Sequence, residues 1–209
     1  MNIIESLEWR YATKKFDNTK KLSKQQLQTI KEAFNLTATS YGLQTLSLVI
    51  VENKEIREEL LPFAFNQKQV IDASHLLVLC YPDTFDGTNV EEYFNRVKQE
   101  RDTPDEILKP FRDFLMNDFN SKSELEKHKS FINQTYIALG NLLTVCALEK
   151  IDSCPMEGFN PSKFDEVLKL KDKNLKSALL LPVGFRAKDD FMAKEKKVRK
   201  SLSEIIIEL

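Results

Sequence analysis

Glycine is scarce in this chain, with only five glycines among 209 residues. Neither GxGxxG nor GxxxxGKS/T occurs in the sequence. These two loops are the common glycine-rich cradles for the phosphates of dinucleotides and nucleoside triphosphates. The usual glycine-rich phosphate sites are therefore absent.

Cysteine and histidine are also rare. The cysteines are Cys80, Cys146 and Cys154, an odd number without a CxxC pair, which argues against a disulfide framework or a zinc site and fits a reducing cytoplasm. The histidines, His75 and His128, lie far apart, and no nucleophile-elbow motif accompanies them. We interpret both as structural or solvated, and we expect neither a metal centre nor Ser-His-Asp chemistry.

No surplus of either charge is present, because 31 Lys and Arg nearly cancel 32 Asp and Glu. A net charge of −1 argues against a protein built mainly to bind nucleic acid. The N-terminus lacks the pattern of a signal peptide. Residues 130–148 are free of charge but contain Asn133, Gln134, Asn141 and Thr144, which are costly in lipid. We read this run as a buried helix of a cytoplasmic protein rather than a membrane span.

The hydrophobic fraction of 42% supports a real core, and no linker or repeat divides the chain. We therefore predict a single α+β domain over residues 1–209. A polar middle, residues 83–121, is expected to form a helical cover with breaks near Pro104 and Pro110. The expected helices are 2–9 with Ile3, Ile4 and Leu7 inward, one starting near a Ser23/Gln26 capping box, 55–61, a long buried helix from Ser123 to about Lys150, and 161–170. The expected strands are 45–51 and 75–81, both covered on two faces, 177–183, and a strand-like end at 205–209.

Three short stretches could carry chemistry. Arg10 and Lys14 lie four apart and face the same way if residues 8–15 continue a helical turn. Lys197 and Arg199 lie two apart, so they converge if the chain there is extended. In the stretch CPMEGF (154–159), a fixed turn can present the backbone N–H of Glu157. Taken singly, such features are more often a solvated charged face or a plain turn.

Together, in their order and spacing, these stretches resemble the nitroreductase family of FMN-dependent NAD(P)H oxidoreductases. The resemblance is closest to the oxygen-insensitive nitroreductase and dihydropteridine reductase branch. It is carried by RYATKKFD (10–17), the helix and turn LSKQQLQTIKEAFNLTATS (22–40), FNQKQVIDASHLLVLC (65–80), NQTYIALGNLLTVCALEKIDSCPMEGFNP (133–161), LPVG (181–184) and KKVR (196–199).

The resemblance implies a role for each matching position. The phosphate of FMN would be held by Arg10, Lys197 and Arg199, and Lys14 would lie near the flavin N1 and O2. The pyrimidine edge would be bonded by Asn66. One face of the ring would be lined by Pro155, Met156, Glu157 and Gly158, with the Glu157 N–H near N5. The second subunit of a homodimer would supply Thr39 and Ser40.

Five positions depart from the family pattern. Ala12 stands where a serine hydroxyl is usual, and Tyr11 where histidine is common in the closest branch; the resemblance still implies that both positions bind the cofactor. The usual Pro-Ser-Ser turn reads Ala-Thr-Ser at 38–40, and Gln69 replaces a frequent lysine. These changes bear on flavin affinity and nicotinamide preference rather than on the fold.

The resemblance further implies a nitroreductase-like fold with a mixed, mainly antiparallel sheet flanked by helices. It implies an interlocked homodimer with a swapped C-terminal tail, and no side-chain catalyst because the flavin carries the chemistry. NADH or NADPH would reduce FMN, and a nitroaromatic, quinone or similar planar acceptor would then be reduced in a ping-pong cycle. Two alternatives stay open: a dehalogenase or flavin-fragmenting enzyme on the same fold, and a non-enzymatic protein that binds a flavin, a nucleotide or an acidic partner.

Overall fold

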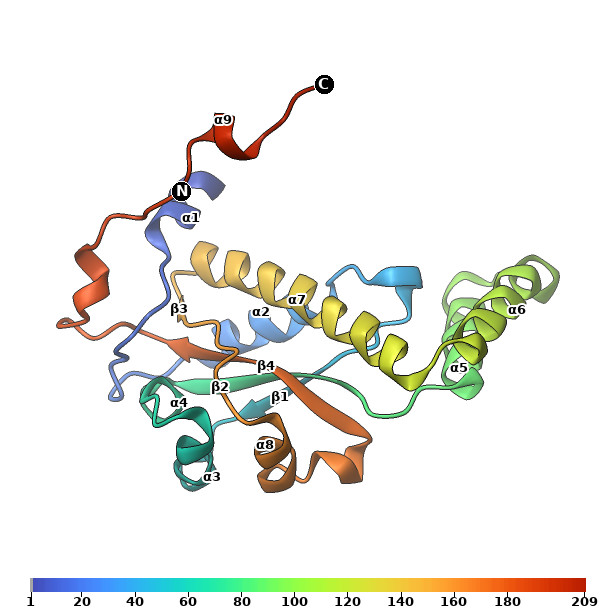
Figure 1. Ribbon diagram of the computed structural model, residues 1–209, viewed down its shortest axis with the longest axis horizontal. Helices are drawn as coiled ribbons and strands as arrows, with labels where there is room; N and C mark the ends of the chain where they lie inside the picture. The colour runs from blue at the N-terminus through green and yellow to red at the C-terminus, as the bar shows by residue number, and fades with distance from the viewer. Residues whose placement is uncertain (1) are drawn as a thin grey trace.

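Four antiparallel strands form the centre of the molecule in the computed structural model, which describes residues 2–209 (Figure 1). Their order across the sheet is β1-β2-β4-β3. The predictions of three strands and of an α+β fold are confirmed, and the two-residue β3 is too short to leave a pattern in the sequence. The strands are β1 Ser47–Val51, β2 His75–Pro82, β3 Asp152–Ser153 and β4 Leu175–Gly184.

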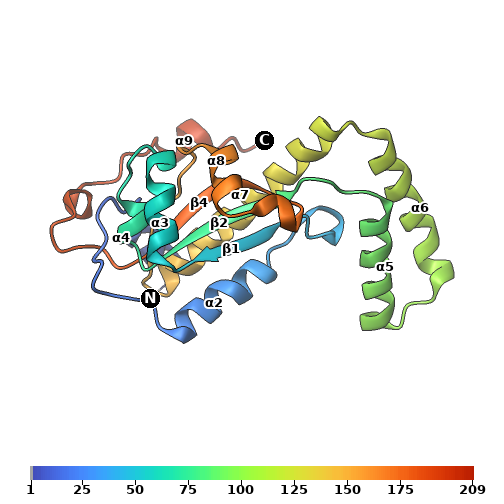
Figure 2. The same cartoon turned by 90° about the horizontal axis from the view of Figure 1, so that it is seen from below.

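Each face of the sheet is covered by a separate layer of helices (Figure 2). Along β2 the side chains alternate, so that Leu76 and Val78 enter one hydrophobic cluster while Leu77 and Leu79 enter the other. Covering the first face are α3 Lys54–Leu60, α4 Gln69–Asp72 and α8 Pro161–Val167, and covering the second are α2 Lys24–Asn35 and α7 Glu124–Leu148. β2 is therefore the buried central strand that its apolar sequence predicts.

β1 differs from that expectation. Only Val51 is fully buried in this strand, and the other four residues are half-buried. The reason is topological: β1 pairs with β2 alone and forms one edge of the sheet. The prediction of a strand covered on both faces is therefore confirmed only in part: Val49 and Val51 pack into one cluster and Leu48 and Ile50 against the other, but the cover of β1 is incomplete.

Helix α7 is the central helix of the fold. Ser123 and Glu126 form the capping box that its sequence predicts, as Ser23 and Gln26 do for α2. The helix is long and apolar enough to cross a membrane by composition alone, but it packs against α1, α2, β2 and β4. One side stays uncovered within the single chain, and this side exposes Tyr136, Ile137 and Leu148.

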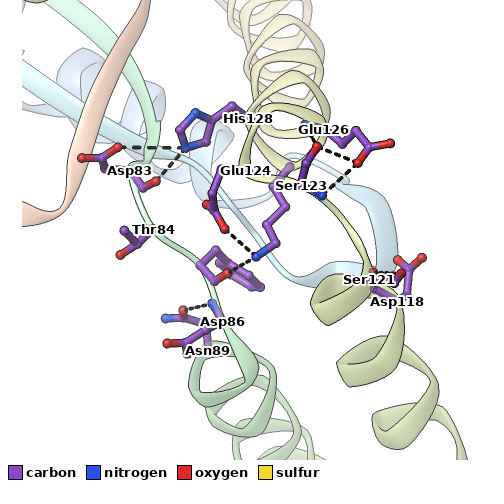
Figure 3. Close-up of polar contacts among 12 residues, drawn as sticks. Asp83, Thr84, Asp86, Asn89, Asp118, Ser121, Ser123, Glu124, Glu126 and His128 are labelled. Carbon is purple, nitrogen blue, oxygen red and sulfur yellow. Dashed lines mark hydrogen bonds and ion pairs between the residues drawn. The ribbon is translucent and has the colours of Figure 1, made fainter.

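The polar middle forms two helices that project away from the sheet (Figure 1), so the predicted helical cover and its break near Pro104 are confirmed, whereas the predicted break near Pro110 is wrong. These are α5 Gly87–Arg101 and α6 Asp105–Ser121; Pro104 caps α6, whereas Pro110 lies inside it. We call residues 83–121 the cover. At the base of the cover, two side chains of α7 contact the segment that follows β2. The His128 ring lies 2.6 Å from the Asp83 carbonyl oxygen, and Lys127 Nζ donates to the Phe85 carbonyl at 3.2 Å (Figure 3).

The chain ends correct two expectations. Helix α1, Ile3–Trp9, forms as predicted, but Ile3 and Ile4 are more than half exposed rather than turned inward. Residues 205–209 form no strand; the short helix α9, Leu202–Ile205, starts at a capping box of Ser201 and Glu204, and an exposed tail follows it. Local capping outweighs β propensity here, because the tail has no strand to pair with among residues 2–209.

Helix α8 also stops earlier than predicted, because Lys169 takes a left-handed conformation with φ 52°. Four short 3-10 turns complete the fold: η1 Ser40–Gly42, η2 Leu61–Ala64, η3 Leu170–Lys173 and η4 Phe191–Lys194.

Gly184, where β4 meets β3, allows a close approach of two backbones. A Cβ added there would lie 2.8 Å from the Ser74 backbone nitrogen and 3.2 Å from the Phe16 ring. We expect Gly184→Ala to lower the free energy of unfolding by about 1–3 kcal/mol, because a backbone neighbour cannot rotate away. Urea unfolding measures this. Gly87→Ala is the control, since its nearest atom is the flexible end of Met116 at 3.9 Å. Equal stability of the two variants would contradict the expectation.

Candidate functional site

Residues 10–13 leave α1 without helical structure and run beside β3, and the chain then bends at Lys14 and Lys15. Arg10 has φ −73° and ψ 146°, so the helix ends at Trp9, and the expectation of a helical turn over 8–15 is wrong. Ala12 instead bridges Ser153, and the Thr13 N–H donates to the Ser153 carbonyl at 3.2 Å. Arg10 and Lys14 therefore lie at the two ends of a short segment that passes Ser153.

Asp190 holds this segment in place. Its side chain is 3% exposed, and Oδ2 accepts the Tyr11 hydroxyl at 2.9 Å and the backbone N–H groups of Lys14 and Lys15 at 3.0 and 3.2 Å. Burial and the bond to Asp190 raise the pKa of Tyr11 well above its ordinary value. The Tyr11 side chain thus faces the protein rather than open space. Asp190 was not predicted from the sequence, because no local pattern indicates its bond to Tyr11, which lies 179 residues away.

Three of the predicted cations gather at one pocket, which we call the cation pocket. Arg10, Lys197 and Arg199 line it together with Ile4, Leu7 and Gly140, and its volume is about 410 Å³. Burial, followed by the charges of Arg10 and Arg199, lowers the pKa of Lys197. None of the three cations forms an ion pair with a carboxylate of residues 2–209. A set of crowded cations without a carboxylate partner suits a doubly charged anion.

The turn at residues 154–158 is fastened to β4. Met156 and Leu180 exchange two backbone hydrogen bonds, of 2.9 and 3.0 Å, while Glu157 and Gly158 after it are exposed. Within residues 2–209, the Glu157 N–H has no acceptor and remains available to a ligand. Lys14 lies close to the start of this turn, because the N–H of Thr13, the residue before it, donates to the carbonyl of Ser153, the residue before Cys154.

The loop that carries Asn66 lies against the same turn. Gln67 Nε2 donates to the Gly158 carbonyl at 2.8 Å, and the Asn160 N–H donates to the Phe63 carbonyl at 2.8 Å. Asn66 itself is exposed in a left-handed conformation, with φ 58°. The structure thus brings Lys14, Asn66 and residues 155–158 into one neighbourhood.

Thr39 and Ser40 lie elsewhere in the single chain. The Ser40 N–H donates to Gln134 Oε1 at 2.9 Å, whereas Glu157 contacts Tyr136 and, after burial, raises the pKa of that tyrosine. Gln134 and Tyr136 are two residues apart on α7 and so point roughly 200° apart around the helix axis. One chain therefore does not bring Thr39 and Ser40 to the 155–158 turn.

Comparison with known proteins assigns the family. The sequence pattern of the Nitroreductase family matches residues 7–185, so this chain belongs to the nitroreductase family. The Staphylococcus epidermidis protein named "Putative NAD(P)H nitroreductase SERP2086" is 35% identical, over 98% of this chain and 95% of its own length.

Solved structures confirm the nitroreductase-like fold. The structure of YdfN from Bacillus subtilis, which is named a nitroreductase provisionally, gives a TM-score of 0.87 at 16% identity and covers 99% of this chain and 98% of that one. A provisionally named nitroreductase from Exiguobacterium sibiricum, solved in complex with FMN, gives 0.85 at 17% identity, covering 100% and 98%. At these identities the likeness concerns the fold alone.

Proposed function

We propose that this protein is an FMN-dependent NAD(P)H oxidoreductase that reduces nitroaromatics, quinones or similar electron-poor planar acceptors in a ping-pong cycle. The observation that carries the proposal is the pair of clusters at the two ends of the 10–16 segment. One end is the cation pocket, and the other is Lys14 near the start of the 155–158 turn, against which the Asn66 loop lies. An FMN molecule has a matching charged end and ring end.

Each cluster has a task that its chemistry supports. Arg10, Lys197 and Arg199 hold the phosphate by side chains, since the chain has no glycine-rich loop for it. Asn66 bonds the ring edge, and the Glu157 N–H points to the ring nitrogen N5 from a turn that Pro155, Met156 and Gly158 complete. Lys14 places a positive charge where reduction adds negative charge. The bound flavin supplies the two-electron chemistry between nicotinamide and acceptor.

The active form is a homodimer, which brings Thr39 and Ser40 of one copy to the flavin of the other. This proposal is supported by the uncovered side of α7, the exposed apolar residues of α1 and the exposed apolar tail. Apolar surface of this extent marks an interface rather than a solvent face.

Two measurements test the proposed function. The purified protein should show the visible absorption of a flavin, or take up added FMN, and should oxidise NADH or NADPH steadily with menadione or a nitrofuran as acceptor. Kinetics with both nicotinamides across the acceptor panel would establish the preferred pair. FMN binding without turnover would favour a dehalogenase, a flavin-fragmenting enzyme or a non-enzymatic binding protein. Absence of FMN binding would refute the proposal.

Truncation tests the role of the tail. A chain that ends at Ser203 loses four large aliphatic residues, of which Ile207 is 84% exposed. We expect it to dissociate at concentrations where the full chain stays dimeric, because the tail packs on the partner subunit. Size-exclusion chromatography with light scattering decides this. An undisturbed dimer would count against the exchange of the tail.

A further inference from the structure

Arg186 has a fixed orientation close to the 10–16 segment. Its Nε donates to Asp152 Oδ1 at 2.7 Å, and its backbone N–H donates to Asp152 Oδ2 at 2.8 Å. Asp152 is a buried residue of β3. A guanidinium that is bonded to a buried carboxylate cannot swing freely, so its plane is set by the sheet.

Two aromatic rings sandwich this guanidinium. Its Cζ lies 4.2 Å from the centre of the Trp9 ring and 4.5 Å from the centre of the Tyr11 ring. Such stacking is favourable for a flat cation with delocalised charge. The bond from the Tyr11 hydroxyl to Asp190 holds the second ring from its far end. We call Arg186, Trp9 and Tyr11 the arginine clamp.

The clamp fixes the direction of the residue between the two rings. Arg10 has an extended backbone, in which neighbouring side chains point to opposite sides. With Trp9 and Tyr11 both turned to Arg186, the Arg10 side chain must point away from the clamp. That direction is the cation pocket, which Arg10 lines.

We propose that Arg186, stacked between the two aromatic rings, is a positioning residue that keeps Arg10 directed into the cation pocket. The inference rests on the proposed function, because the ligand of that pocket is the FMN phosphate. The competing role for Arg186 is simpler: it adds a fourth positive charge near the cation pocket. This charge contributes to the lowered pKa of Lys197. The two roles differ in whether shape or charge matters, and substitution separates them.

Binding titrations with FMN and riboflavin are the first test. Arg186→Met removes the clamp, and we expect the dissociation constant for FMN to rise about tenfold through weakened phosphate contact. Riboflavin lacks the phosphate and should bind the variant and the wild type equally. Arg186→Lys keeps the charge but cannot stack flat between two rings, so it should lose FMN affinity nearly as much. Lys188→Met is the control; this exposed cation has no ion pair or hydrogen bond among residues 2–209, and its loss should change neither constant.

The outcomes separate the competing roles. Wild-type FMN affinity in Arg186→Lys would show that only the charge matters and would overturn the proposal. An equal loss for FMN and riboflavin, or no loss in Arg186→Met, would overturn it as well. Trp9→Leu should weaken FMN binding like Arg186→Met, and the double variant should be no weaker than either, because both act through one clamp. Additive losses would contradict a shared route.

Fluorescence gives a readout that needs no flavin. Trp9 is the only tryptophan, so its emission reports on the clamp directly. We expect Arg186→Met and Arg186→Lys to change this emission in the flavin-free protein and Lys188→Met to leave it unchanged. Unchanged emission in all three would mean that the clamp is absent, even if FMN binds. Failure of the wild-type protein to bind FMN would refute the proposed function instead, whatever the emission shows.

Discussion

Replacing Lys14 by alanine is expected to slow the reaction of the FMN-loaded protein with NAD(P)H about a hundredfold, the lower end for one donor at a developing charge. The lysine lies near the start of the 155–158 turn, next to the Thr13–Ser153 backbone bond, and its backbone is fixed by Asp190. Removing its side chain takes away a positive charge from the place where reduction adds a negative one. Folding should be unaffected, because the side chain is exposed.

Stopped-flow mixing with NADH and NADPH measures this rate as the loss of the flavin's visible absorption. Lys15→Ala is a close control, since it removes the same charge from the next residue, whose side chain pairs with Asp189 on the surface. The control should keep the wild-type rate. A Lys14→Ala rate equal to that of wild type would mean that Lys14 is not beside the ring.

Arg199→Ala is expected to raise the dissociation constant for FMN by one to two orders of magnitude, roughly 1.5–3 kcal/mol for one charge-assisted hydrogen bond. Arg199 lines the cation pocket and has no carboxylate partner among the described residues. The effect depends on the phosphate, so riboflavin should bind the variant and the wild type almost equally. Lys200→Ala, a change at the next exposed cation, should leave both constants unchanged.

Fluorescence titration of FMN and riboflavin against the three proteins decides the role of Arg199. Equal losses for FMN and riboflavin in Arg199→Ala would indicate damage to the fold. Equal affinity of Arg199→Ala and wild type for FMN would mean that Arg199 is a solvent-exposed side chain that does not bind the phosphate.

The parts of the fold that depend on local signals could be predicted from the sequence. The capping boxes at Ser23 and Ser123 start helices because their bonds join residues three apart. The apolar run of β2 is buried because it lies between two paired strands. The equally apolar run of β1 is only partly buried, because burial depends on a position in the sheet that the run itself does not encode.

The candidate site could be proposed where motifs carry it and not where distant residues shape it. The structure gathers most of the predicted cations and the 155–158 turn into two clusters, while their roles stay predictions. The course of residues 10–16 depends on Asp190 and Ser153, more than 135 residues away, and it replaces the helical turn that local spacing suggests. The same distance hides Arg186, whose partners come from α1, the 10–16 segment and β3.

The C-terminal tail could not be placed correctly from the sequence, because its composition is typical of a buried strand and the single chain leaves it exposed. Ile205, Ile206 and Ile207 are β-branched and apolar, and they are exposed here without a strand beside them. Their expected place on a partner subunit stays a prediction.

The central claim is that this protein binds FMN and passes electrons from a nicotinamide to it. Anaerobic mixing of the FMN-loaded protein with NADH, and separately with NADPH, tests the claim most directly. We predict that at least one of the two removes the visible absorption of bound flavin, and that menadione then restores it in the absence of further nicotinamide. Retention of the flavin spectrum with both nicotinamides, or failure of the protein to hold FMN at all, would contradict the account.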